Sequence, residues 1–236
     1  IPSAESEIED LPTPNMVKGP KVILQTFLTQ DFPMREYFRE PENPKAMHLG
    51  QRKLMNSEIE FLTRVLKHKP GNYTLLYVGA APVQHIPILS DMFPEVKFEL
   101  WDPAPFAIKE TNRIKIYREF FTTETMQRYM KTPNLLLVSD IRTTPYDNYK
   151  AKDSDGPDKE FEERIIIDMN MQKQWVLDLK PVRSLLKFRF PFIEGKTDYF
   201  DGIFFFQAFP PPQSNETRLE VGPHPKIKTY DHTKYE

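Results

Sequence analysis

The sequence predicts an α/β fold in which helices cover both faces of a mostly parallel sheet that has an antiparallel edge strand. Short apolar runs alternate with amphipathic segments as far as residue 179, a pattern typical of βαβ units. Beyond that point strand-like runs follow one another between proline-rich and polar stretches, which favours antiparallel pairing at one edge. We expect one domain over residues 46–236, preceded by an extended, proline-rich N-terminal arm over residues 1–45.

The expected helices follow from apolar spacing and from end signals. The segment 50–68 brings Leu54, Ile59, Leu62 and Leu66 onto one helical face. Further helices are expected at 82–92, with Pro82 in the first turn and Pro87 as a point of shortening or kinking, at 122–130, capped by Thr122, and at 160–179. The polar, turn-rich stretch 142–160 is expected to be a surface loop.

The expected strands are apolar runs bounded by turn residues. They lie at 73–79, 97–102, 113–121, 134–140, 184–192, 201–209 and 217–222. The run PPPQSN at 210–215 cannot lie inside a strand, because proline has no N–H to donate to a ladder.

Composition narrows the class of protein. The chain has 236 residues, 39% of them hydrophobic and 28% charged, which is ordinary for a globular domain. It has no cysteine, so disulfides and Cys-ligated zinc sites are excluded, and we expect no metal. No apolar run approaches the ~20 residues of a membrane span, so no membrane partner is expected. The net charge of −2 means that any nucleic-acid contact must rely on a local basic patch.

Two strand ends indicate a nucleoside ligand. Gly79 follows the first strand and would let the backbone approach a ligand, and Asp102 ends the next strand, where an acid can accept hydrogen bonds from a ribose. The stretch TLLYVGAAPVQH lacks the three glycines that cradle a pyrophosphate. S-adenosylmethionine (SAM) has a ribose but no phosphate, so it fits this pattern better than a dinucleotide. The alternative is that both residues only form turns.

Asp140 and Lys187 are candidates for chemistry. Asp140 ends the most apolar strand, where it either caps a loop or lies at the rim of a site. Lys187 lies in the apolar run SLLKFRFPF, sharing a strand face with Leu185 and Arg189, so it is either at a sheet edge or directed into a site. A desolvated lysine can act as a base.

These residues belong to an ordered set of motifs that resembles a known family. The motifs are EYFREPE, GQRK, LYVGAAPVQHI, LWD, VSDIR, SLLKFRFPF, NETRL and DHTKYE. In this order they resemble the poxvirus cap-specific mRNA (nucleoside-2′-O-)methyltransferases, which also serve as the small subunit of the viral poly(A) polymerase. The resemblance implies a Rossmann-like SAM-dependent methyltransferase fold in a distant relative from a large DNA virus.

The resemblance also implies catalytic residues. The family's Lys-Asp-Lys-Glu tetrad falls on Lys53, Asp140, Lys187 and Glu216. Lys187, with a pKa lowered by burial and by Lys53, would accept the proton of a ribose 2′-hydroxyl or stabilise the alkoxide, while the two acids orient the lysines.

Cofactor contacts are implied in the same way. The residues for SAM are Gln51, Gly79, Ala81, Pro82, His85, Asp102 and Asp140. Two positions depart from the family: Val83 replaces a glycine, which puts a backbone contact in doubt, and Ala104 replaces an arginine near the adenosine.

The resemblance implies contacts with capped RNA as well. A cationic 7-methylguanosine would stack between Phe192 and a ring of the N-terminal arm and meet acidic side chains. The expected cap residues are Tyr37, Phe38, Phe192, Glu194 and Glu236, and the expected RNA residues are Arg142, Arg189 and Arg218.

We therefore expect a cap-specific 2′-O-methyltransferase whose partners are capped RNA and a viral poly(A) polymerase catalytic subunit. We expect it in the host cytoplasm or the virion. Two alternatives stay open: a non-catalytic RNA-binding or polymerase processivity subunit on the same fold, and a ribose 2′-O-methyltransferase of uncapped RNA. The intact tetrad argues against the first, and the cap residues separate the expected activity from the second.

Overall fold

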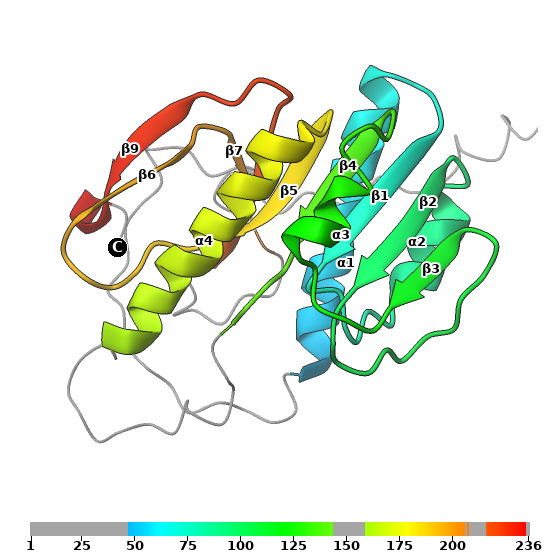
Figure 1. Cartoon of the computed structure of the whole chain (residues 1–236), viewed down its shortest axis with the longest axis horizontal. Helices are drawn as coiled ribbons and strands as arrows, with labels where there is room; N and C mark the ends of the chain where they lie inside the picture. The colour runs from blue at the N-terminus through cyan, green and yellow to red at the C-terminus, as the bar shows by residue number, and fades with distance from the viewer. Residues whose placement is uncertain (1–46, 144–158, 206, 208–215, 235–236) are drawn as a thin grey trace, which may run out of the picture.

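The computed structural model describes residues 47–143, 159–205, 207 and 216–234 (Figure 1). The predicted N-terminal arm and most of the predicted surface loop lie outside these residues. Seven strands form the main sheet in the order β3-β2-β1-β4-β5-β8-β7. Their bounds are β1 Tyr73–Val78, β2 Val96–Trp101, β3 Ile114–Tyr117, β4 Leu135–Ser139, β5 Arg183–Phe188, β7 Ile203–Phe205 and β8 Thr217–Val221.

The sheet confirms the predicted fold class. The five strands from β3 to β5 pair in parallel, and β1 and β4 are neighbours in the middle. β8 pairs antiparallel with both β5 and β7, which gives the antiparallel edge. β1 and β4 are buried throughout except for one residue of β1, as expected for parallel strands covered on both faces.

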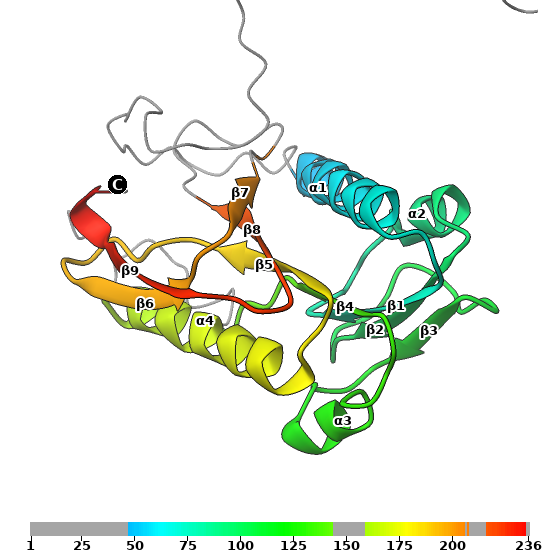
Figure 2. The ribbon, with the colours of Figure 1, turned by 90° about the horizontal axis from the view of Figure 1, so that it is seen from above.

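Helices cover both faces of this sheet (Figure 2). α1 (Met47–His68) and α2 (Ile86–Met92) lie on one face, and α3 (Thr123–Gln127) and α4 (Lys159–Leu179) lie on the other. Each face has its own cluster of buried apolar side chains. The predicted cap of α3 is confirmed, because the Thr122 side chain accepts from the N–H of Thr125 in a capping box.

One predicted helix begins later than expected. α2 starts at Ile86, four residues after the predicted start, and Pro87 instead of Pro82 lies in its first turn. A proline is tolerated there because the first N–H groups of a helix have no partner within it. The residues before α2 form a turn that leads out of β1.

The region after β5 differs most from the prediction. The strand expected at 201–209 is confirmed only as β7, since residues 206, 208 and 209 lie outside the described residues. β6 (Lys196–Phe200), which was not predicted, ends just before it. β6 pairs with β9 (Ile227–Asp231) in a separate two-stranded sheet. Gly202 lies at the corner between β6 and β7, where an added Cβ would stand 2.3 Å from the carbonyl oxygen of Glu220. The corner therefore excludes any larger residue.

None of the helices in the described part of the chain is long and apolar enough to cross a membrane.

The parallel strands point the same way, so the residues that follow them gather at one edge of the sheet. Gly79, Asp102 and Asp140 follow β1, β2 and β4 respectively. In open α/β sheets this edge, beside the central strands, is where ligands bind.

Candidate functional site

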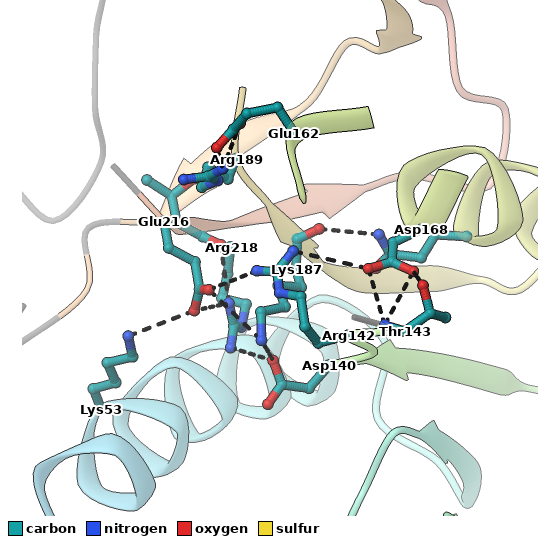
Figure 3. Close-up of polar contacts among 12 residues, drawn as sticks. Lys53, Asp140, Arg142, Thr143, Glu162, Asp168, Lys187, Arg189, Glu216 and Arg218 are labelled. Carbon is teal, nitrogen blue, oxygen red and sulfur yellow. Dashed lines mark hydrogen bonds and ion pairs between the residues drawn. The ribbon is translucent and has the colours of Figure 1, made fainter. Parts of the chain in front are cut away.

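The four residues of the predicted tetrad converge at the carboxyl end of β4 and β5 (Figure 3). Asp140 directly follows β4, Lys187 lies near the end of β5, and Glu216 directly precedes β8. Lys53 approaches from α1, which packs on one face of the sheet. Residues from four separate parts of the chain therefore meet at one point.

Lys187 lies at the centre of this group. Its Nζ is 3.0 Å from Oδ1 of Asp140 and 3.6 Å from Oε2 of Glu216, and its side chain is 14% exposed. The Nζ of Lys53 is 3.5 Å from Oε1 of Glu216. Lys187 is thus neither on an edge strand nor in open solvent, and the interpretation of its strand position as a solvated edge is wrong.

Two arginines complete the cluster, and sequence reasoning did not place them there. Arg218 lies opposite Lys187 in the β5–β8 register. Its Nη2 is 2.7 Å from Oδ1 of Asp140 and its Nη1 is 3.2 Å from Oε1 of Glu216. Because the Arg218 side chain is 3% exposed, we correct its expected RNA contact to a place inside the cluster. Side chains two residues apart in a strand lie on the same face, so Arg218 shares a face of β8 with Glu220. This pairing of opposite charges on one strand face could have indicated the position of Arg218.

Arg142 connects the cluster to α4. Its Nη2 donates to Oε2 of Glu216 at 2.9 Å, and its Nη1 is 3.9 Å from Oδ2 of Asp168. Asp168 also accepts from the backbone N–H and the hydroxyl of Thr143, the latter at 2.6 Å (Figure 3). The Arg142 side chain keeps 24% of its surface exposed, so it remains a candidate for a ligand contact.

Glu216 is surrounded by four cations. Burial alone would raise the pKa of its carboxyl group, but Lys187, Arg218, Lys53 and Arg142 outweigh burial and hold that pKa well below its usual range. The pKa of the Arg218 guanidinium is raised: burial acts to lower it, and Asp140 and Glu216 reverse the effect. Both groups therefore stay charged at neutral pH.

The turn after β1 contains Gly79 for a reason that the sequence did not reveal. Gly79 has φ +78°, and a Cβ there would lie 2.8 Å from the carbonyl carbon of Asp140 and 2.8 Å from the nitrogen of Ile141. The close neighbour is the protein's own backbone. Gly79 therefore lets the end of β4 approach the end of β1, which brings the turn for the expected ligand against Asp140.

Asp102 organises the same turn. Its Oδ2 accepts from the N–H of Ala81 at 3.1 Å, and its Oδ1 accepts from the N–H of Ala104 at 2.8 Å. Pro82 follows in a cis peptide bond, and Val83 has φ +35° with its side chain buried. Positive φ is unusual for a β-branched residue, so Val83 adopts a backbone conformation that favours glycine.

His85 and Gln51 lie together, but His85 does not face outward. The Nε2 of His85 is 2.6 Å from Oε2 of Glu58, and its Nδ1 is 3.1 Å from Oε1 of Gln51. Both ring nitrogens therefore have partners within the protein, and His85 is 5% exposed. Neither ring nitrogen is therefore left for the expected cofactor contact, and His85 instead contacts Gln51, another residue expected at the cofactor. Glu58, buried beneath it, was missed because a glutamate in an amphipathic helix resembles a solvated residue.

The predicted cap residues are only partly described. Phe192 and Glu194 lie in the stretch between β5 and β6, with Phe192 half-buried and Glu194 exposed. Tyr37, Phe38 and Glu236 lie outside the described residues. Arg189, expected to contact RNA, instead contacts Glu162 on α4 and lies 4.6 Å from the centre of the Phe192 ring.

The cluster brings together amines and carboxylates, groups that can exchange a proton and balance charge. Its amine and carboxylate groups lie within ion-pairing distance of one another, at the edge where the sheet binds ligands. In the described ranges no three His, Asp or Glu side chains are grouped so as to hold a metal.

Comparison with known proteins identifies the family. The family described as poly A polymerase regulatory subunit matches residues 26–230. The cap-specific mRNA (nucleoside-2′-O-)-methyltransferase of fowlpox virus (strain NVSL) is 30% identical over 195 residues, which cover 76% of this chain and 60% of the relative. The protein of the same name from myxoma virus (strain Lausanne) is 27% identical over 192 residues, 75% of this chain and 54% of that one. The chain thus matches less than two thirds of the length of either relative.

A solved structure supports the fold independently. Bluetongue virus VP4, described as a multifunctional RNA-capping production line, superposes with a TM-score of 0.56 at 12% identity, over 86% of this chain and 32% of that one. At this identity the likeness concerns the fold alone. Since the family match extends over most of the chain, the chain belongs to the poly A polymerase regulatory subunit family.

Proposed function

We propose that this chain transfers a methyl group from SAM to the ribose 2′-hydroxyl of the first transcribed nucleotide of capped mRNA. One observation carries the proposal: the Nζ of Lys187 lies 3.0 Å from Asp140 and 3.6 Å from Glu216, and the backbone of Asp140 lies beside the turn that contains Gly79. The relatives in fowlpox and myxoma virus bear the name of this activity.

The chemistry requires a group that handles one proton. A ribose hydroxyl is a weak acid, and its oxygen must lose the proton as the bond to the methyl carbon forms. The amine of Lys187 accepts this proton, and Asp140 and Glu216 fix the direction of the amine. Positioned proton transfer of this kind contributes roughly 10²–10⁴-fold to a rate.

The turn after β1 fits the methyl donor. Bound SAM supplies an electrophilic methyl group on a sulfonium sulfur. Each carboxylate oxygen of Asp102 accepts one backbone N–H and keeps a second lone pair for a ribose hydroxyl. Gln51 is held by His85 and lies two residues before Lys53 in α1. These residues hold the donor against the end of β4, next to Asp140.

The cluster also supports contact with RNA. Lys53 and Arg142 are the cations of the cluster with the most exposed side chains, at 16% and 24%. Both contact Glu216, so this one carboxylate orients two cationic groups that can bind RNA phosphates. Such contacts weaken as salt concentration rises.

A single assay tests the proposal. The full chain is incubated with SAM that carries a tritiated methyl group and with capped or uncapped RNA of identical sequence. Transfer to the capped RNA alone, at the 2′-oxygen of the first nucleotide, is the expected result. Equal transfer to both RNAs would contradict the proposed cap-specific activity and favour the alternative, ribose 2′-O-methylation of uncapped RNA.

The family match favours a second function. A poly A polymerase regulatory subunit acts with a catalytic subunit, so we propose that this chain also binds a viral poly(A) polymerase. The test is the length of poly(A) made by that polymerase with and without the chain. If Lys187→Ala removes methyl transfer but leaves the poly(A) length unchanged, the two functions use different parts of the molecule.

A further inference from the structure

The 189–195 segment joins β5 to β6 without forming a helix or a strand. It contains Phe192 and Glu194, an aromatic ring and an exposed acid two residues apart. Irregular segments are usually the mobile part of a site, yet this one is bonded near each end by a buried polar side chain from another element. The two side chains belong to Glu162 and His232.

Glu162, on α4, holds the first part of the segment. Glu162 is 2% exposed, and each of its carboxylate oxygens lies 2.5 Å from Nη2 of Arg189. Its Oε2 also accepts from the backbone N–H of Phe192 at 2.8 Å. The guanidinium that Glu162 holds lies 4.6 Å from the centre of the Phe192 ring and 5.4 Å from that of Phe161. One buried acid therefore fixes both the backbone and the ring environment of Phe192.

His232, in the short helix η3 (His232–Lys234), holds the second part. Its Nδ1 is 2.7 Å from the carbonyl oxygen of Ile193, and its backbone N–H donates to the carbonyl oxygen of Gly195 at 3.0 Å. A carbonyl only accepts, so Nδ1 carries the proton and Nε2 accepts from the hydroxyl of Thr197, 2.7 Å away. His232 is 2% exposed, so these bonds are shielded from water.

Burying a carboxylate and an imidazole is unfavourable unless their polar atoms are hydrogen-bonded. The side chains of Glu162 and His232 bond to this segment and to Thr197 in β6. Such an arrangement removes the conformational freedom that a binding loop would otherwise lose when it meets a ligand. The guanidinium over Phe192 shows that a planar cation can lie against this ring.

We propose that Glu162 and His232 are positioning residues that pre-form a site for a planar cationic base on Phe192 and Glu194. The ligand class is a purine carrying a positive charge, as in 7-methylguanosine. This inference rests on the proposed function, because it assigns the cap to the 189–195 segment. Neither residue touches the reacting atoms; each acts through the segment that it holds.

A matched pair of variants at His232 tests the proposal. In His232→Asn the amide nitrogen takes the place of Nδ1 and keeps the bond to Ile193, whereas in His232→Gln the amide reaches toward Thr197 and loses that bond. Binding of 7-methyl-GTP and GTP is measured by calorimetry on the full chain, with S-adenosylhomocysteine binding and the melting temperature as checks on folding. Glu162→Gln is measured alongside.

We expect His232→Gln and Glu162→Gln to weaken 7-methyl-GTP binding roughly tenfold, as for one lost buried hydrogen bond. His232→Asn should stay within roughly threefold of wild type, and S-adenosylhomocysteine affinity should not change. With capped RNA, KM should rise while kcat at saturation is kept.

Two outcomes overturn the proposal in different ways. If wild type binds 7-methyl-GTP more tightly than GTP but all three variants bind it equally well, the positioning role is wrong and the proposed function stands. If wild type itself does not distinguish 7-methyl-GTP from GTP, the cap site is wrong and the inference fails with it.

Discussion

Gly79→Ala should damage both the fold and the reaction, because Gly79 joins the donor turn to the tetrad. A Cβ at Gly79 would lie 2.8 Å from backbone atoms of Asp140 and Ile141, whereas ordinary contact begins at 3.4 Å. The backbone at the end of β4 must therefore move by about 0.6 Å, the difference between these distances. That movement carries Asp140 away from the amine of Lys187, now 3.0 Å distant.

The expected magnitude has two parts. An alanine at φ +78° costs about 1–2 kcal/mol, and forcing an extra methyl group into a packed region costs about 1–3 kcal/mol. We therefore expect the free energy of unfolding to fall by about 3 kcal/mol. A displacement of this order at a reacting group also slows the reaction, by roughly 10–100-fold at saturating substrates.

Urea denaturation and single-turnover methyl transfer measure the two effects. Gly71→Ala is the matched control: Gly71 also has a positive φ, +157°, but a Cβ there meets nothing within 4 Å. Gly71→Ala adds a methyl group at a positive φ without a steric contact, so we expect a loss of only about 1 kcal/mol and an unchanged rate. If Gly79→Ala is as stable and as active as Gly71→Ala, the contact between the two strand ends does not constrain the site.

Four further predictions concern single residues. Lys187→Arg should reduce methyl transfer at least ~100-fold with unchanged S-adenosylhomocysteine affinity, since arginine stays charged and cannot accept a proton; full activity in this variant would remove the proton-acceptor role. Glu216→Gln should lower the free energy of unfolding by about 3–5 kcal/mol at pH 7, because it leaves buried cations without their partner. Because the native pKa of Glu216 is depressed, its charge stabilises the fold above the unfolded value of ~4.3 and this contribution is lost as pH falls through the native pKa, so urea titrations of wild type and variant should converge in acid. Asp102→Ala should abolish most of the rise in melting temperature that S-adenosylhomocysteine gives wild type; an undiminished rise would place the donor elsewhere. Val83→Gly should be about 1 kcal/mol more stable than Val83→Ala, the reverse of the usual order, because both lose the side chain but only glycine relieves φ +35°.

The order of strands and helices could be predicted because it is encoded in local patterns. The apolar runs that became β1, β2 and β4 are bounded by turn residues, and parallel strands place their following residues at one edge. The convergence of Asp140 and Lys187 follows from that rule once both strands are recognised. The resemblance added Lys53 and Glu216, which no local pattern separates from surface charges.

What the sequence did not reveal depends on contacts between distant segments. The role of Gly79 depends on the backbone of Asp140, and the place of Arg218 depends on its register with Lys187. The sheet of β6 and β9 was missed because its strands are short and alternate weakly, and because β9 follows two prolines, Pro223 and Pro225. The roles of Glu162 and His232 could not be predicted, because each bonds to a segment distant in the sequence and part of its bonding is to backbone atoms, which the sequence does not distinguish.

The tetrad is built from parts of unequal stiffness. Asp140, Lys187 and Glu216 adjoin or lie in β4, β5 and β8, three neighbouring strands whose ladders fix their spacing. Lys53 alone belongs to a helix, and its 3.5 Å contact with Glu216 joins that helix to the cluster. A small shift of α1 on the sheet would therefore change the distance of one charge and leave the geometry of the other three intact. The three residues on the strands therefore keep fixed distances from one another, and only Lys53 can change its distance from them. Thermal motion at this site should be concentrated in Lys53.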